Sequence, residues 1–253
     1  MRVFRKAIVV LALLFGVVTG RECYAQVLDS DTSSTRTIRV FVAFCDNVHQ
    51  GIVPVPAELG NGADPVHNLY WGALYGVRTV LDKNPSWKRI ERVKNPRDGV
   101  LERCVYRHAQ NNVCLVADAY EGSRIRTAIE EFLASAADGE DDLVVYVGHD
   151  GLMDFDVDPP VTKADTSRKQ CDAIILDCLS RKYFGDKIRP AGANPLLWTS
   201  GLMAPEGYIL EAALEGWVAG ETTDRIRDRA ARAYAKYQKC SLESARRLLV
   251  TGW

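Results

Sequence analysis

The chain has 253 residues, 47% of them hydrophobic, and its 32 basic and 33 acidic side chains leave a formal net charge of −1. Its basic residues are scattered, with the densest stretch at 225–232, so the composition argues against a nucleic-acid-binding surface. The length suffices for one large hydrophobic core or two small ones, and α/β domains of this size often form a single unit.

Residues 1–25 have the parts of a secretory signal peptide. Arg2 and Lys6 give a positively charged start, an apolar run follows over 7–18, and Ala25 is a small residue at the expected cleavage site. The run is shorter than the ~20 apolar residues that span a bilayer, which favours a cleaved signal over an uncleaved anchor. We therefore expect a periplasmic or secreted protein with no stable membrane insertion after cleavage.

A polar leader over 26–36 is expected to precede one domain over 37–253. Short, continuously apolar runs predict buried strands at 37–44, 113–119, 143–147, 173–176 and 195–199. Apolar residues at helical spacing predict helices near 74–81, 125–136, 209–217, 226–237 and 242–249, with a short helical stretch at 181–184. This alternation predicts an α/β fold, with a mostly parallel sheet flanked by helices on both faces.

Six cysteines remain after cleavage, and an even number in an oxidising compartment predicts disulfide bonds. They are Cys45, Cys104, Cys114, Cys171, Cys178 and Cys240. A catalytic cysteine among them would have to stay unpaired, which would leave enough partners for two disulfides and one spare thiol. Their spacings contain no C-x-x-C pair, so no zinc site is expected.

Polar residues follow the predicted strands at the edge where an open parallel sheet places its binding sites. The first strand leads into Asp46, Asn47 and His49, the third into His149, and the fourth into Cys178. A histidine at a strand end is ordinarily a hydrogen-bonded loop residue, and an exported cysteine is ordinarily half of a disulfide. Their joint placement after successive strands is what favours nucleophilic cysteine chemistry.

A free thiol has a pKa of about 8.5 and is mostly protonated at neutral pH, although the thiolate is the nucleophile. A nearby imidazolium and the N-terminus of the following helix would both stabilise a thiolate at Cys178. His149 would take the thiol proton as general base and later protonate a leaving amine.

Two of these segments resemble the caspase-like cysteine peptidases, the group of caspases, metacaspases, legumain, gingipains and clostripain. In that group one apolar strand ends in His-Gly and another ends in the nucleophilic cysteine. The matching segments here are 143–149, ending in Gly148-His149, and 173–178, ending in Asp177-Cys178. The segment 197–217 is similar to the strand and helix that shape the substrate pocket of these enzymes.

The resemblance covers roughly residues 140–220 and implies a caspase-like three-layer sandwich with His149 as base and Cys178 as nucleophile. Asp150 follows His149 where the family has glycine, so the backbone N–H of Asp150 or Gly151 is the implied oxyanion donor. Counting an Asp-x-Cys register from Asp177 would place Leu179 at the nucleophile position and imply an inactive enzyme. The order strand, cysteine, helix favours Cys178.

The sequence thus favours an exported cysteine hydrolase, a thiol protease acting on a peptide or protein substrate through a His-Cys dyad. The expected substrate-binding residues are Asp46, Asn47, His49, Ser200 and Glu206. No metal or organic cofactor is implied. The acids of the loop 154–158 are expected to be solvated, since the loop lacks the glycine and distal glutamate of a calcium loop.

Two other interpretations stay open. The chain is alternatively a catalytically inactive caspase-like domain that binds a peptide or an envelope partner. A hydrolase with another nucleophile is disfavoured, because the sequence has no G-x-S-x-G motif.

Overall fold

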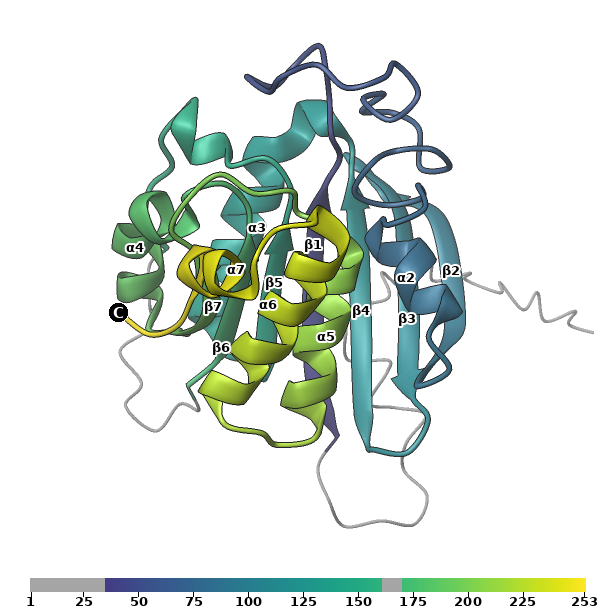
Figure 1. Ribbon diagram of the computed structural model, residues 1–253. Coiled ribbons are helices and arrows are strands. Elements are labelled where there is room, and N and C mark those ends of the chain that lie inside the picture. The colour runs from purple at the N-terminus through teal and green to yellow at the C-terminus, as the bar shows by residue number, and fades with distance from the viewer. Residues whose placement is uncertain (1–34, 161–169) are drawn as a thin grey trace, which may run out of the picture. The chain divides into compact units, whose positions relative to one another are not determined.

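Eight strands form one mixed sheet in the computed structural model, which describes residues 35–160 and 170–253 (Figure 1). In chain order the strands are β1 (Arg36–Ala43), β2 (Trp87–Arg97), β3 (Val100–His108), β4 (Val113–Tyr120), β5 (Leu143–Val147), β6 (Asp172–Leu176), β7 (Asn194–Thr199) and β8 (Leu249–Val250). The expected signal peptide and most of the expected leader lie outside the described residues. β1 begins at Arg36, one residue before the expected start of the domain.

The strand order across the sheet is β2-β3-β4-β1-β5-β6-β7-β8. The five strands from β4 to β7 in this order run parallel, whereas β2 and β3 on one side and β8 on the other are antiparallel to their neighbours. β5 lies at the centre of the sheet, and all five of its side chains are fully buried. A continuous apolar run of this kind is typical of a parallel strand covered on both faces.

Helices cover both faces of the sheet, as predicted. One face packs against α2 (Val77–Lys83), α5 (Gly207–Val218), α6 (Thr223–Gln238) and α7 (Leu242–Leu248), all on the near side in Figure 1. The other face packs against α3 (Ile125–Asp138) and α4 (Ser180–Ala191). Two short 3₁₀ helices, η1 (Gly122–Arg124) and η2 (Gly151–Met153), follow β4 and β5. Within the described residues, no helix combines the length and apolarity that a membrane span requires.

The hairpin of β2 and β3 was not among the predicted elements. Only Trp87 of β2 is buried, and half of its remaining side chains are both exposed and charged, so the strand lacks the apolar run on which the prediction relied. The helix expected near 74–81 begins later, at Val77, and Leu74 lies before it with 63% of its surface exposed. The helical stretch expected at 181–184 is part of the longer α4.

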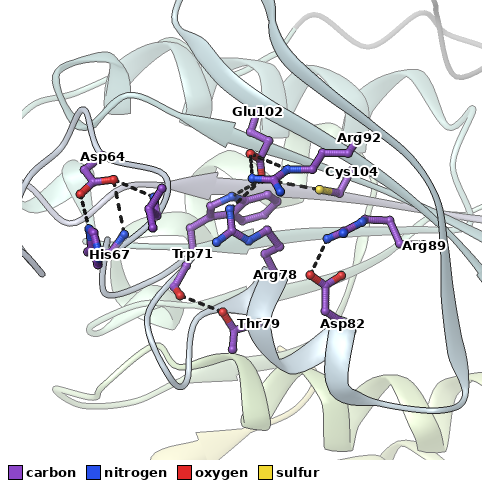
Figure 2. Close-up of polar contacts among 12 residues, drawn as sticks. Asp64, His67, Trp71, Arg78, Thr79, Asp82, Arg89, Arg92, Glu102 and Cys104 are labelled. Atoms are coloured by element: carbon purple, nitrogen blue, oxygen red, sulfur yellow. Dashed lines mark hydrogen bonds and ion pairs between the residues drawn. The ribbon is translucent and has the colours of Figure 1, made fainter.

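A buried carboxylate ties the segment before β2 to β3. Glu102 of β3 has no exposed surface and accepts hydrogen bonds from the Trp71 indole at 2.9 Å, from Arg78 at 3.0 Å and from Arg92 at 2.6 and 2.9 Å (Figure 2). Burial alone would raise the pKa of Glu102, but these hydrogen bonds outweigh it and hold that pKa below its ordinary value. One charged side chain therefore fixes α2 and the loop around Trp71 against the hairpin.

We expect Glu102→Gln to lower the free energy of unfolding by about 3 kcal/mol, because it leaves two partly buried arginines without their carboxylate. Urea denaturation at neutral pH measures the change. Glu91→Gln is the matched control, since Glu91 is exposed on the neighbouring strand of the same hairpin. Equal stability of the two variants would contradict the role given to Glu102.

Candidate active site

The ends of β5 and β6 bring His149 and Cys178 to the same edge of the sheet. Val147 pairs with Leu176 in the parallel register of these strands, and the Gly148 N–H extends the ladder to the Leu176 carbonyl at 3.3 Å. His149 and Cys178 each lie two residues past that pair, on neighbouring strands whose backbones are about 4.8 Å apart. The two residues therefore leave the sheet at the same level of its carboxyl edge.

His149 is buried and held on two sides. Its backbone carbonyl accepts a hydrogen bond from the Tyr146 hydroxyl at 2.8 Å, and its ring Nε2 lies 2.6 Å from a carboxylate oxygen of Asp154. Asp154 was expected to be a solvated acid, and its side chain is 41% exposed, but η2 turns the chain back so that its carboxylate also bonds to the His149 ring. Asp156, two residues further on, is 86% exposed and pairs with Lys187. Asp154 is thus a site residue that the sequence pattern did not single out.

Cys178 is a half-buried, unpaired thiol. Its Sγ lies 3.5 Å from the Met203 carbonyl oxygen and accepts a hydrogen bond from the Met203 N–H at 3.4 Å. Burial raises the pKa of Cys178; the Met203 N–H opposes this, and the charge of nearby Asp150 adds to it. In the part of the chain that the structure describes, no hydrogen bond joins Cys178 to His149, and the raised pKa disfavours the thiolate.

A left-handed turn follows the cysteine. Leu179 has φ 60° and ψ 27°, a conformation that costs free energy for a residue other than glycine, and its N–H donates to the Gly201 carbonyl at 2.9 Å. α4 begins at the next residue, Ser180, whose N–H donates to the Thr199 hydroxyl at 3.1 Å. Cys178 therefore lies between a strand and the start of a helix, as the sequence predicted, while the Leu179 backbone forms the turn.

Two carboxyl groups are buried beside these residues without compensating cations. Asp150 and Asp177 have no exposed surface, and neither oxygen of Asp177 nor Oδ2 of Asp150 has a hydrogen-bond partner within the described residues. Burial, opposed in part by the Leu152 N–H, raises the pKa of Asp150 to about 7, and burial together with the Asp150 charge raises the pKa of Asp177 well above its ordinary value. Both groups are more easily kept neutral than ionised, as expected for two acids that share an apolar site.

The backbone N–H groups at the expected oxyanion position, those of Asp150 and Gly151, are buried and make no hydrogen bond within the described residues. Gly151 is also closely packed, since a Cβ there would lie 2.6 Å from the Phe155 ring. The two expected donors thus lie directly after His149 on the same turn.

The loop after β1 forms a pocket at the same edge. A cavity of about 310 Å³ is lined by Asp46, Asn47 and His49 together with residues of the segment 57–63 and Glu121. The buried Asp46 carboxylate holds the His49 ring through Nδ1 at 2.8 Å, and the Asn47 side chain bonds to the backbone of Val55. The structure therefore brings three of the five expected substrate-binding residues together.

The other two expected substrate residues lie on the β7 side. The Ser200 hydroxyl donates to the Arg247 carbonyl at 2.7 Å, so its proton is used in a hydrogen bond within the protein. The Glu206 carboxylate accepts from the Tyr208 hydroxyl at 2.6 Å and from Gln238 at 2.9 Å. Met203 contacts the Cys178 thiol, and Glu206 lies three residues after Met203 in the sequence. The pocket residues Asp46, Asn47 and His49 have no such link to the thiol along the chain.

Five of the cysteines are free thiols: Cys45, Cys104, Cys171, Cys178 and Cys240. The bridges that six cysteines predict are therefore not formed among these five. Cys45 and Cys104 pack on one face of the sheet and Cys171 on the other, which separates them.

Over residues 35–160 and 170–253, no group of three or more histidine, cysteine and acidic side chains is arranged to hold a metal ion. Comparison of the chain with family models, curated proteins and solved structures finds no match. The chemistry of the site therefore has to be argued from its own residues.

We expect Asp177→Asn to stabilise the protein at pH 8 by about 1–3 kcal/mol, because an amide does not ionise and so removes the free energy that the unfolded state gains when this carboxyl group loses its proton. The folded-state pKa values of Asp150 and Asp177 lie above their unfolded values, so the folded protein holds extra protons and its stability falls as pH rises from about 4 through 7 and above. Thermal unfolding at several pH values measures this slope, which Asp177→Asn should flatten. An unchanged slope would contradict the assignment.

Proposed function

We propose that the carboxyl edge of the sheet is the active site of a caspase-like cysteine hydrolase, a peptidase with Cys178 as nucleophile and His149 as general base. The observation that carries the proposal is the parallel register of β5 and β6, which delivers the histidine and the cysteine at one level. The free, half-exposed state of the thiol supports it. The strand order of a mostly parallel sheet with helices on both faces is compatible with it.

The reaction starts from a neutral thiol, because burial raises the pKa of Cys178. His149 takes the thiol proton as Sγ attacks the carbonyl carbon of the substrate, and the N–H groups of Asp150 and Gly151 stabilise the resulting oxyanion. The C–N bond then breaks, the histidine gives its proton to the leaving amine, and a thioester remains on Cys178. Water, deprotonated by His149, hydrolyses the thioester and restores the thiol.

The pocket of the β1 loop is the proposed binding region for part of the substrate. Its lining by Asp46 and His49 gives it a polar wall. The Asp46 carboxylate is already occupied by the His49 ring and by backbone N–H groups. The exposed face of His49, rather than Asp46 itself, is therefore the group offered to a ligand.

One observation favours the alternative, an inactive domain that binds a peptide or an envelope partner. The Cys178 thiol contacts the Met203 backbone and makes no hydrogen bond to His149 in the described chain. In the catalytic interpretation the two groups come together on substrate binding, since catalytic hydrogen bonds often tighten only in the complex. The two interpretations differ in the effect of replacing Cys178.

We also propose that the chain is exported, with cleavage after Ala25. The proposal rests on the composition of residues 1–25, which lie outside the described residues.

Cys178→Ala should abolish cleavage of a peptide library prepared from digested cell protein, with products identified by mass spectrometry. Cys240→Ala is the matched control, because Cys240 is also a partly exposed free thiol but lies beyond α6. Iodoacetamide labelling of the wild-type protein should modify Cys178. Cleavage that survives in Cys178→Ala would overturn the proposal, whereas partner binding that survives without any wild-type cleavage would favour the inactive domain.

For export, we expect the mature protein recovered from an expressing bacterium to start at Gln26 and to fractionate outside the cytoplasm. Intact mass and N-terminal sequencing provide the measurement. Reversal of charge at Arg2, Arg5 and Lys6 should leave the full-length chain in the cytoplasm, because the signal needs its positive start. A chain that keeps residues 1–25 in the wild type contradicts the proposal.

A further inference from the structure

Asp154 links His149 to the loop that follows β1. One oxygen of its carboxylate, Oδ2, lies 2.6 Å from the His149 Nε2 and 3.4 Å from the Gly51 backbone nitrogen, whose N–H donates to it. The His149 side chain is 9% exposed and that of Asp154 is 41% exposed. The contact therefore joins a buried ring to a carboxylate at the surface of the proposed site.

The chemistry of this contact determines which nitrogen of His149 is available. A carboxylate accepts hydrogen bonds and does not donate them, so Nε2 carries the proton that points to Asp154. In a neutral imidazole the other nitrogen, Nδ1, is then the unprotonated one and the only ring atom able to accept a proton. Asp154 is the group bonded to the ring itself, while the Tyr146 hydroxyl donates to the backbone carbonyl of His149.

The Gly51 side of the contact is sterically tight. A Cβ at residue 51 would lie 2.8 Å from Oδ1 of Asp154, closer than real Cβ contacts come. A Cβ at residue 51 would therefore displace the Asp154 carboxylate, which is the end of a flexible side chain, from its present position. Gly51 belongs to the same loop as Asp46 and His49, so the position of this loop and that of the His149 ring depend on each other through Asp154.

We propose that Asp154 is the positioning residue of the dyad: it holds the His149 ring with Nε2–H toward itself and Nδ1 toward the thiol, and Gly51 keeps it in place. This inference rests on the proposed role of His149 as the base. It assigns a third member to the site and makes the β1 loop part of the catalytic geometry. Closure of that loop over a substrate would tighten the Gly51–Asp154–His149 chain of contacts.

The hydrogen bond can be tested without any substrate. In ¹⁵N-histidine-labelled protein, the Nε2 proton of His149 should give a downfield NMR signal that exchanges slowly with water, because it is buried and bonded to a carboxylate. The signal should disappear in Asp154→Asn and weaken in Gly51→Ala. It should remain in Asp156→Asn, whose acid lies in the same loop and pairs with Lys187 instead. An unchanged signal in Asp154→Asn overturns the inference.

Kinetics on a peptide chosen from the library experiment test the consequence. Asp154→Asn should lower kcat about 10- to 100-fold with KM nearly unchanged, since a misplaced base loses part of the factor that general-base catalysis contributes. Gly51→Ala should lower kcat in the wild-type background but cause little further loss in Asp154→Asn, because contacting residues that act together are not additive. Gly185→Ala is the control, as a Cβ there meets no atom within 4 Å.

The outcomes separate the two proposals. Full activity of Asp154→Asn beside an inactive Cys178→Ala overturns the positioning role and leaves the proposed function intact. Additive losses in the double variant show that Gly51 acts by some other route and overturn its part in the inference. If the wild-type chain cleaves nothing, the proposed function fails, and the NMR signal alone decides whether Asp154 holds the ring.

Discussion

The hydrogen-bonded register of β5 with its two neighbours determines where each candidate catalytic group stands. Val147 pairs with Val42 of β1 on one side and with Leu176 of β6 on the other. A slip of one residue would turn every side chain of β5 to the opposite face, and burial on both faces makes such a slip costly. The apolar interior of the sheet therefore fixes the positions of His149 and Cys178, although these residues themselves contribute little to stability.

Buried carboxyl groups are compensated by cations in one part of the sheet and uncompensated in another. Glu102 and Asp118 are buried near the β3–β4 side, and each is surrounded by arginines that compensate its charge. Asp150 and Asp177, at the carboxyl edge, are buried without a cation. Uncompensated groups of this kind lower stability and persist where the surrounding core tolerates them, and strongly perturbed acids gather at functional sites. The contrast marks the carboxyl edge as the part of the molecule that is not optimised for stability alone.

Continuous apolar runs predicted the centre of the fold well: β5 matches its expected bounds, and β4, β6 and β7 each match theirs within about two residues. The β2–β3 hairpin was missed because its exposed strand is charged, although Asp98-Gly99 between the strands is a hairpin turn signal. The placement of His149 and Cys178 followed from strand order. The Asp154 contact did not, since it depends on a 3₁₀ turn, and the joint burial of Asp150 and Asp177 without cations is not revealed by any local pattern.

The raised pKa of Cys178 bears on how a free thiol could persist in an oxidising compartment, which the proposed export would require. Oxidation and disulfide exchange proceed through the thiolate, so a buried thiol that stays protonated reacts slowly with both. A resting thiolate–imidazolium pair would be more nucleophilic and also more easily lost in an oxidising compartment. A site in which the thiolate forms only when His149 takes the proton would avoid this loss by oxidation. Under the proposed function the base has to be oriented correctly for the thiol to lose its proton, so the Asp154 carboxylate that contacts the His149 ring would matter more than it would beside a preformed ion pair.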